Sequence, residues 1–285
     1  MSRPNIDHRL KSADLSTRWI DPDTIVLNPQ IPVQLFLPPK DLDDYHFVGT
    51  HDKDGFNGGV MFLRVHEWTV KMLVEIIALP RIAPKLDLGI EKAQEATEKV
   101  IMSDMFRHQT LYQPRTWYNP YQLRNSTFEG KNGSLLVHFQ GLEGDKWVNM
   151  AKYLHNGTTP GPAFEMPLAN TTYHNETTTY WSRVRQSKKL LECAREHRGR
   201  NLGASVGHMY SVLNFQADEE EVFAEAITEL HTALYPPRKN ATISATAAIT
   251  RMPATMATSL SSRTSMASTA TLGSHEVSAS DPSSV

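Results

Sequence analysis

The sequence predicts an α/β fold in which a mixed β-sheet is flanked by helices. Short runs of β-branched and apolar residues alternate with longer segments whose apolar residues recur at helical spacing, and this alternation fills the first 155 of the 285 residues. Such alternation is typical of α/β domains. The formal net charge is −2 and 21% of the residues are charged, so no basic field favours nucleic acid as a partner.

The composition also argues against several kinds of site and segment. No apolar run approaches the roughly 20 residues of a membrane span, and residues 1–8 lack the apolar core of a signal peptide. Cys193 is the only cysteine, which excludes a disulfide framework and a cysteine metal site. Asn-x-Ser/Thr tripeptides, the glycosylation acceptors of lumenal proteins, are nevertheless frequent. They begin at Asn125, Asn132, Asn156, Asn170, Asn175 and Asn240.

Local patterns place the individual elements. Runs bounded by turn residues predict strands at 25–27, 46–50, 56–65, 110–114 and 135–139. Apolar residues three and four apart predict helices at 68–80, 87–106, 145–154, 177–198 and 218–235. Pro80 is expected to end the first helix. Residues 31–37 fit a short helix or an extended segment equally well.

These elements divide the chain into four parts. Residues 1–18 are polar and unpatterned, which indicates a poorly ordered lead-in. Residues 19–155 carry the alternating strands and helices. Residues 156–235 begin with a Gly/Thr/Pro/Asn-rich connection and form a C-terminal helical extension. Residues 236–285 are rich in Ser, Thr and Ala without apolar periodicity, which is typical of a disordered tail.

Two carboxylates lie in the first apolar run. Asp21 and Asp23 flank Pro22, directly before the strand expected at 25–27. A buried strand does not accept two ionised aspartates without a counter-charge, so we expect both at a kink beside the strand. Residues two apart in an extended segment point the same way, and both carboxylates can then bind one divalent cation. The alternative is an ordinary turn with solvated carboxylates.

Two other stretches can be brought to the same place by the sheet. Asn57 lies at a junction of loop and strand and is followed by Gly58 and Gly59, where we expect the backbone to approach another group closely. His138 follows the apolar run 135–137, and an imidazole beside carboxylates is typical of Mn²⁺ or a later metal. Taken alone, His138 also fits a buried neutral histidine bonded to backbone, and Asn57 an ordinary turn residue. A cation with open positions would neutralise a diphosphate leaving group.

These three stretches, in this order, resemble the galactosyl-, mannosyl- and xylosyltransferases of glycosyltransferase family 34. The resemblance covers about residues 19–155 and is carried by Asp-Pro-Asp-Thr-Ile-Val-Leu-Asn-Pro at 21–29, Asp-Gly-Phe-Asn-Gly-Gly-Val-Met-Phe-Leu-Arg at 54–64 and Val-His-Phe-x-Gly at 137–141. It implies a GT-A fold, retention of anomeric configuration and a nucleotide-sugar donor bound through Mn²⁺. It also implies a type II membrane protein on the lumenal side of the Golgi.

The resemblance further implies a role for individual residues. Asp21, Asp23 and His138 correspond to the metal ligands. The catalytic residues that orient the sugar correspond to Gln94 and Asn57. Donor binding is assigned to the two aspartates and to Asn57, Gly58, Gln94 and Gly141.

The chain departs from the family in two places. In the helix expected at 87–106, Gln94 is kept but Ala93 stands where the family has a carboxylate. The family also places a nucleotide-binding half before the two aspartates, whereas twenty residues precede Asp21. We therefore expect a truncated or mis-started chain, or a degenerate copy, that lacks most of this half.

Two functions are consistent with these features. The first is a metal-dependent retaining hexosyltransferase that moves galactose or mannose from UDP-galactose or GDP-mannose to a glycan acceptor, with a membrane-anchored full-length form and a glycosyltransferase complex as a further partner. The second is a truncated, inactive remnant with at most a binding role. A hydrolase built on the same ligands has no nucleophile motif to support it. The aromatic residues Trp117, Tyr118 and Tyr121 fit either stacking on an acceptor sugar or packing on the domain.

Overall fold

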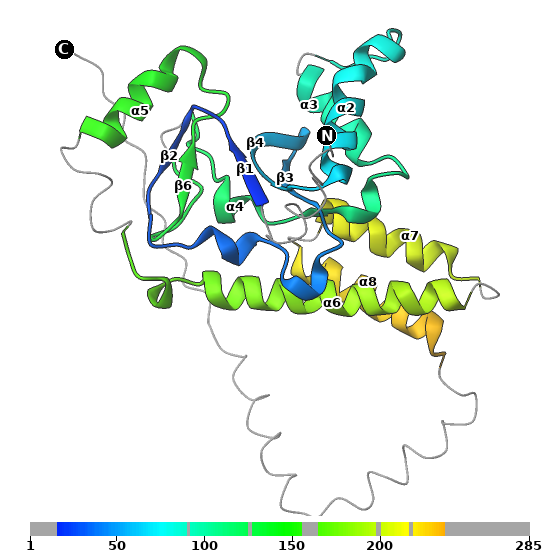
Figure 1. Cartoon of the computed structure of the whole chain (residues 1–285). Helices are drawn as coiled ribbons and strands as arrows, with labels where there is room; N and C mark the ends of the chain where they lie inside the picture. The colour runs from blue at the N-terminus through cyan, green and yellow to red at the C-terminus, as the bar shows by residue number, and fades with distance from the viewer. Residues whose placement is uncertain are drawn as a thin grey trace, which may run out of the picture. The chain divides into compact units, whose positions relative to one another are not determined.

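The computed structural model describes residues 16–89, 92–124, 127–155, 165–197, 201–216 and 219–236. Figure 1 shows two small sheets with helices around them. The expected mixed sheet flanked by helices is confirmed, whereas the GT-A fold itself stays a prediction. Residues 1–15 of the expected lead-in and residues 237–285 of the expected tail lie outside the described residues.

The larger sheet has four strands in the order β1-β4-β3-β5. Strand β4 pairs antiparallel with both β1 and β3, and β5 runs parallel to β3. The bounds are Ser16–Ile20 for β1, Phe47–Asp52 for β3, Gly55–Arg64 for β4 and Thr110–Tyr112 for β5. Residues 16–18 therefore belong to a strand and not to the lead-in, because pairing with β4 orders this polar stretch without an apolar pattern of its own.

A second, two-stranded sheet brings distant parts of the chain together. Strand β2 (Thr24–Val26) pairs antiparallel with β6 (Leu136–His138). The register places Thr24 opposite His138. Because Thr24 directly follows Asp23, this pairing carries the imidazole of His138 to the carboxylate that precedes β2.

The larger sheet is covered on both faces. Val48 and Phe62 pack into one core with the C-terminal helices, whereas Phe47 and Leu63 pack into another core with α2 (Glu67–Ile82) and α3 (Lys92–Ile101). Successive strand residues point to opposite faces, so one layer of strands serves both cores. Helix α2 continues past Pro80, contrary to expectation, because proline in the last turn removes little of the hydrogen-bond ladder and the amide of Ala83 still bonds to Leu79 O at 2.9 Å.

The C-terminal helices share the core of the sheet. They are α6 (Tyr173–Glu196), α7 (Gly203–Ser211) and α8 (Glu220–Leu234), with a π-helical turn at Val212–Gln216. Tyr180 of α6 and Phe223 of α8 are buried with Phe36 and Trp117 from the first half of the chain. The expected helical extension is therefore a layer of the same unit, which Figure 1 shows as the long α6 with α7 and α8 beside it.

The remaining elements are short. Helix α4 spans Arg115–Tyr118 and α5 spans Lys146–His155. Residues 31–37 contain a 3₁₀ turn at Val33–Phe36, which settles the choice between helix and extended segment in favour of a helix of one turn. Further 3₁₀ turns lie at Lys40–Leu42, Arg107–Gln109, Glu143–Asp145 and Leu168–Asn170. Among the helices of the described residues, none combines the length and apolar character needed to cross a membrane.

Candidate metal centre

Asp21 and Asp23 lie in the turn that joins β1 of one sheet to β2 of the other. The backbone of Asp21 is held by β4, since its amide donates to Gly59 O at 2.8 Å. The backbone of Asp23 is held by the segment after β6, since Phe139 N donates to Asp23 O at 2.9 Å. The expected kink beside a strand is confirmed, and each aspartate is anchored to a different sheet.

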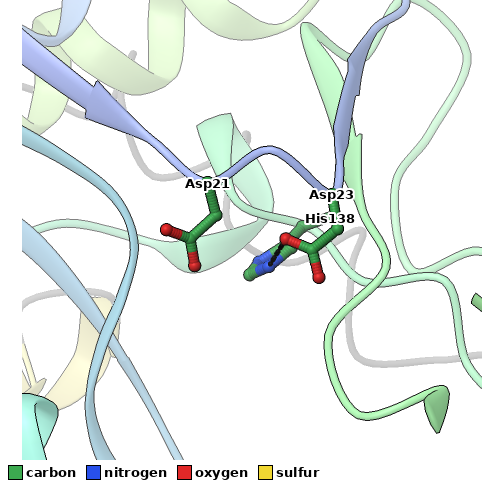
Figure 2. Close-up of side chains that lie close together, drawn as sticks. All are labelled: Asp21, Asp23 and His138. Atoms are coloured by element: carbon green, nitrogen blue, oxygen red, sulfur yellow. Dashed lines mark ion pairs between the residues drawn. The ribbon is translucent and has the colours of Figure 1, made fainter.

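The side chains of Asp21, Asp23 and His138 converge, as Figure 2 shows. His138 Nε2 lies 3.3 Å from Asp23 Oδ1, and one ligand atom of each residue lies within 4.8 Å of the others. For metal–ligand bonds of about 2.2 Å, two ligands at right angles lie about 3.1 Å apart. The pair His138–Asp23 already has this spacing, and a ligand atom of Asp21 lies within 4.8 Å of both. Asp23 is only 8% exposed, so the solvated-turn alternative is wrong for this residue.

Gly59 explains how the imidazole reaches this position. A Cβ atom on Gly59 would lie 2.7 Å from His138 Nδ1 and still closer to Cε1. No side chain fits there, because real Cβ contacts are not that short. The expected close approach of the backbone at Gly58 and Gly59 is confirmed at Gly59, and the group that approaches it is the imidazole.

A chain of hydrogen bonds fixes which imidazole nitrogen carries the hydrogen. Gly59 N donates to Asn57 Oδ1 at 3.0 Å, so this Asn57 atom is an acceptor and the Asn119 atom 2.8 Å from it is the amide Nδ2. Asn119 Nδ2 also donates to Thr50 Oγ1 at 2.9 Å. Asn119 Oδ1 is therefore the atom 2.8 Å from His138 Nδ1, and an amide oxygen only accepts. The hydrogen is on Nδ1, and the Nε2 lone pair of the neutral ring faces Asp23.

This arrangement favours a positive charge between His138 and Asp23. Burial lowers the pKa of His138, against the opposing influence of Asp23 and Asp21, so the ring is neutral at pH 7. A lone pair and a carboxylate oxygen 3.3 Å apart are two acceptors that face each other. A metal ion between them makes this contact favourable. The alternative of a histidine bonded to backbone is excluded for its ring, because its Nδ1 partner is the side chain of Asn119.

Two other side chains bond to the carboxylates. Lys146 Nζ, at the start of α5, lies 2.6 Å from Asp23 Oδ2, and Trp19 Nε1 donates to Asp21 Oδ1 at 2.9 Å. Burial alone would raise the pKa of Asp23, but the hydrogen bond from Lys146 contributes to holding it below its usual value. Asp23 is therefore ionised at neutral pH and each carboxylate keeps an oxygen for a cation.

The other predicted site residues lie around the first residues of β4. Gln94 Oε1 accepts from Gly58 N at 2.9 Å, which ties α3 to this strand. Asn57 is 2% exposed and its oxygen accepts two hydrogen bonds within the protein. Ala93 is exposed, one residue before Gln94. Direct contact of Asn57, Gly58 or Gln94 with a donor sugar stays a prediction.

The aromatic residues and Gly141 are placed differently. Trp117 and Tyr118 are buried in the larger core, which confirms packing as their role. Tyr121 is 7% exposed, and its ring packs edge-on against the imidazole of His138 with the ring centroids 5.5 Å apart. Gly141 is exposed, with a φ of +71° that favours glycine, in the loop after β6.

The sequence analysis did not identify Asn119 and Lys146 as site residues. Asn119 lies in the Trp/Tyr/Pro-rich segment, where no period or motif marks it, and its function depends on partners in β3 and β4. Lys146 begins a predicted helix, where a lysine usually points to solvent. A signal for Lys146 was its place eight residues after His138, at the start of the helix that follows the same strand.

Comparison with known proteins gives one informative match. The chain is 29% identical over 146 residues to the alpha-1,2-galactosyltransferase of Schizosaccharomyces pombe. The match covers 48% of this chain and 36% of that protein, so the chain spans about a third of the relative's length. No family model matches the chain, and no solved structure matches it. The chain is thus a distant relative of a glycosyltransferase and carries a group of three side chains able to hold a metal ion.

Proposed function

We propose that the chain is part of a metal-dependent retaining glycosyltransferase that moves a hexose from a nucleotide sugar to a glycan hydroxyl. The observation that carries this proposal is the neutral imidazole of His138, whose Nε2 lone pair faces the ionised Asp23 with Asp21 beside it. Distant similarity to a galactosyltransferase supports transfer of a sugar over other metal chemistry. Two carboxylates and one imidazole suit Mn²⁺.

Asp21, Asp23 and His138 would hold the cation, which when bound would neutralise the negative charge of a leaving diphosphate. In the transfer, the bond from the anomeric carbon to the diphosphate oxygen breaks, and a bond to the acceptor oxygen forms on the same face of the sugar. The acceptor's hydroxyl proton leaves with the nucleoside diphosphate. Lys146 Nζ, now on Asp23 Oδ2, is placed to add a second positive charge at the diphosphate.

The sugar itself would be oriented by the residues around the start of β4. Gln94 holds the Gly58 amide, and Asn57 holds Gly59 against the imidazole. In the proposal these two side chains and Gly141 border the donor. The donor is UDP-galactose or GDP-mannose, and the similarity to a galactosyltransferase supports UDP-galactose.

Metal binding tests the proposal most directly. We expect isothermal titration of the purified chain to show one Mn²⁺ site. We also expect pulsed electron paramagnetic resonance of the bound Mn²⁺ to show coupling to the nitrogen of His138. Asp23→Asn and His138→Gln should each abolish the site, and His138→Gln should also remove the nitrogen coupling. A matched control is Glu225→Gln on α8, an exposed residue outside the three-residue group. A chain that binds no Mn²⁺, or whose affinity is unchanged in Asp23→Asn, would falsify the proposal.

A non-catalytic, binding role is the second candidate, and Ala93 is the observation that favours it. Ala93 stands where the family has a carboxylate, directly before Gln94, and the Gln94 oxygen is already bonded to Gly58 N. Ala93 is exposed, so Ala93→Glu is accommodated without repacking. The binding role is supported if the unsubstituted chain binds Mn²⁺ and UDP or GDP but does not hydrolyse UDP-galactose, while the Ala93→Glu variant does. If the unsubstituted chain hydrolyses the donor, the enzyme holds.

Placement in the Golgi lumen, with a membrane-anchored full-length form, is part of the same proposal. The described sequon residues Asn132, Asn170 and Asn175 are all exposed, as glycosylation requires. Expression through a secretory pathway should therefore give a form whose mass falls on treatment with peptide N-glycosidase. A chain that leaves the pathway without glycans contradicts the lumenal placement.

A further inference from the structure

A cavity that the metal centre does not use lies between the β3–β4 hairpin and the loop that follows β6. Its volume is about 590 Å³. The hairpin contributes Asp52, Lys53 and Asp54, and the loop contributes residues 140–142. The third wall is formed by residues after α4, including Tyr121 and Arg124. We call this space the hairpin cavity.

Hydrogen bonds connect the hairpin cavity to the metal centre. Tyr121 OH donates to Asp52 Oδ2 at 2.7 Å, and Asn57 Nδ2 lies 3.5 Å from the same oxygen. Asn57 is in turn bonded to Asn119, which bonds to His138. Two side chains, Asn57 and Asn119, therefore connect the cavity wall at Asp52 to the metal ligand His138, and the ring of Tyr121 itself contacts the imidazole.

The charges that line the hairpin cavity balance. Three cations (Lys53, Arg115, Arg124) and three carboxylates (Asp52, Asp54, Glu129) are present. Most are paired with one another or with backbone. Arg115 Nη2 bonds to Glu129 Oε1 at 2.9 Å, Lys53 lies 3.1 Å from Asp54, and Arg124 Nη2 bonds to Gly141 O at 3.0 Å. A phosphate or diphosphate would meet three carboxylates without an excess of positive charge, which is unfavourable.

The same groups are well suited to hydroxyls. An ionised carboxylate has about four acceptor positions, and a hydroxyl-rich ligand can donate to those left over by the pairs above. Recognition by stacking is restricted, because the guanidinium of Arg115 lies over the ring of Tyr121 at 3.9 Å from its centroid. The ligand class that fits a polar, electrically balanced cavity of this kind is a neutral sugar.

We propose that the hairpin cavity binds the acceptor glycan as a neutral hexose residue. This rests on the proposed function, since an acceptor is needed only if a sugar is transferred. The loop at 140–142 begins two residues after His138 and lines the cavity, so a hexose in the cavity lies beside the place where the donor would be held. Gly141 then borders both the donor and the acceptor.

The test is a titration of the full chain with methyl α-D-mannopyranoside and methyl α-D-galactopyranoside, read by amide NMR shifts, with and without Mn²⁺. We expect saturable shifts at residues 52–54 and 140–142 with a dissociation constant of about 1–10 mM, the range of a few net hydrogen bonds. Asp54→Asn and Gln140→Ala change exposed cavity residues and should weaken binding about fivefold each. Glu225→Gln on α8 should leave it unchanged.

Three outcomes overturn the acceptor site. The first is that neither glycoside gives a saturable shift at these residues up to about 50 mM. The second is that Glu225→Gln weakens glycoside binding as much as the cavity variants do. The third is that the anion galactose 1-phosphate binds to the same residues more tightly than the neutral glycosides. Mn²⁺ titration of the same samples separates this result from the proposed function. Normal Mn²⁺ binding without glycoside binding removes only the acceptor site, whereas loss of Mn²⁺ binding in the unsubstituted chain contradicts the metal centre.

Discussion

Asn119→Ala tests the claim that a buried amide prepares His138 for a metal. The substitution removes the acceptor for His138 Nδ1 and two donated hydrogen bonds, to Thr50 and Asn57. Removal of an outer partner of a metal-bound histidine typically costs 10–100-fold in affinity. We therefore expect the dissociation constant for Mn²⁺ to rise by about 10–100-fold, because the ring loses the contact that fixes its tautomer and orientation.

The same change lowers stability, and a matched control separates the two effects. Asn28 is fully buried like Asn119 and also makes three hydrogen bonds, donating to Gly133 O and Met166 O and accepting from Gln30 N. Each buried partner left unpaired costs about 1–3 kcal/mol. Both alanine variants should therefore lose about 2–4 kcal/mol in the free energy of unfolding. Only Asn119→Ala should change metal affinity.

The assay is isothermal titration with Mn²⁺ beside urea denaturation of each variant. A Mn²⁺ affinity that is unchanged in Asn119→Ala would refute the role given to the amide. An affinity that falls equally in Asn28→Ala would show that general destabilisation, and not the tautomer, is the cause. If Asn119→Ala does not fold, Asn119→Ser keeps a smaller hydroxyl in place and should show the same order of affinities.

Three further predictions concern single residues. Gly59→Ala should abolish Mn²⁺ binding because its Cβ would overlap the imidazole, while Gly58→Ala, whose Cβ has no neighbour nearer than 3.6 Å, should keep it; equal effects in titration would contradict the packing argument. Lys146→Met should tighten Mn²⁺ binding several-fold in the absence of a nucleotide, since the ammonium on Asp23 Oδ2 competes with the cation; weaker binding would show that Lys146 instead supports the site. Burial, followed by the neighbouring His66 and Arg64, lowers the pKa of His46 to about 4 from 6.5. The unfolded chain thus binds the extra proton first, and stability present above pH 6.5 should be lost as the pH falls toward 4. His46→Phe should flatten this part of the stability curve measured by urea denaturation, and an unchanged slope counts against the prediction.

The part of the site that is local in sequence could be predicted. Asp21 and Asp23 are two residues apart, and their charge beside an apolar strand already required a kink and a counter-charge. Gly59 was predicted to meet another group closely, and it does. That this group is the imidazole of His138 depends on how β6 pairs with β2, and no local sequence pattern predicts that pairing. His138 was a candidate from its place after an apolar run, and the resemblance to a family favoured it as a metal ligand over a buried neutral histidine.

Other features depend on tertiary contacts and could not be predicted. Helix α7 contains Gly203 and Gly207 and lacks a clear apolar period, but Met209 is fully buried in the larger core and packing stabilises the helix. Strand β1 is polar and forms because β4 offers it a partner. Asn119 bonds to residues of β3 and β4, far from it in the chain, so its role exists only in the folded state.

The contacts around Gly59 show why the ligands are prepared to different degrees. Gly59 holds the amide of Asp21 through its carbonyl oxygen, the side chain of Asn57 through its amide, and the imidazole of His138 against its Cα. His138 is thereby fixed in ring orientation and tautomer before a cation arrives, and Asp23 is buried at ligand distance from it. Asp21 is half-buried and its side chain bonds to the exposed Trp19. Asp21 is therefore the least firmly held of the three ligands, and Trp19→Phe, which removes that hydrogen bond but keeps a ring, should strengthen Mn²⁺ binding only slightly in isothermal titration.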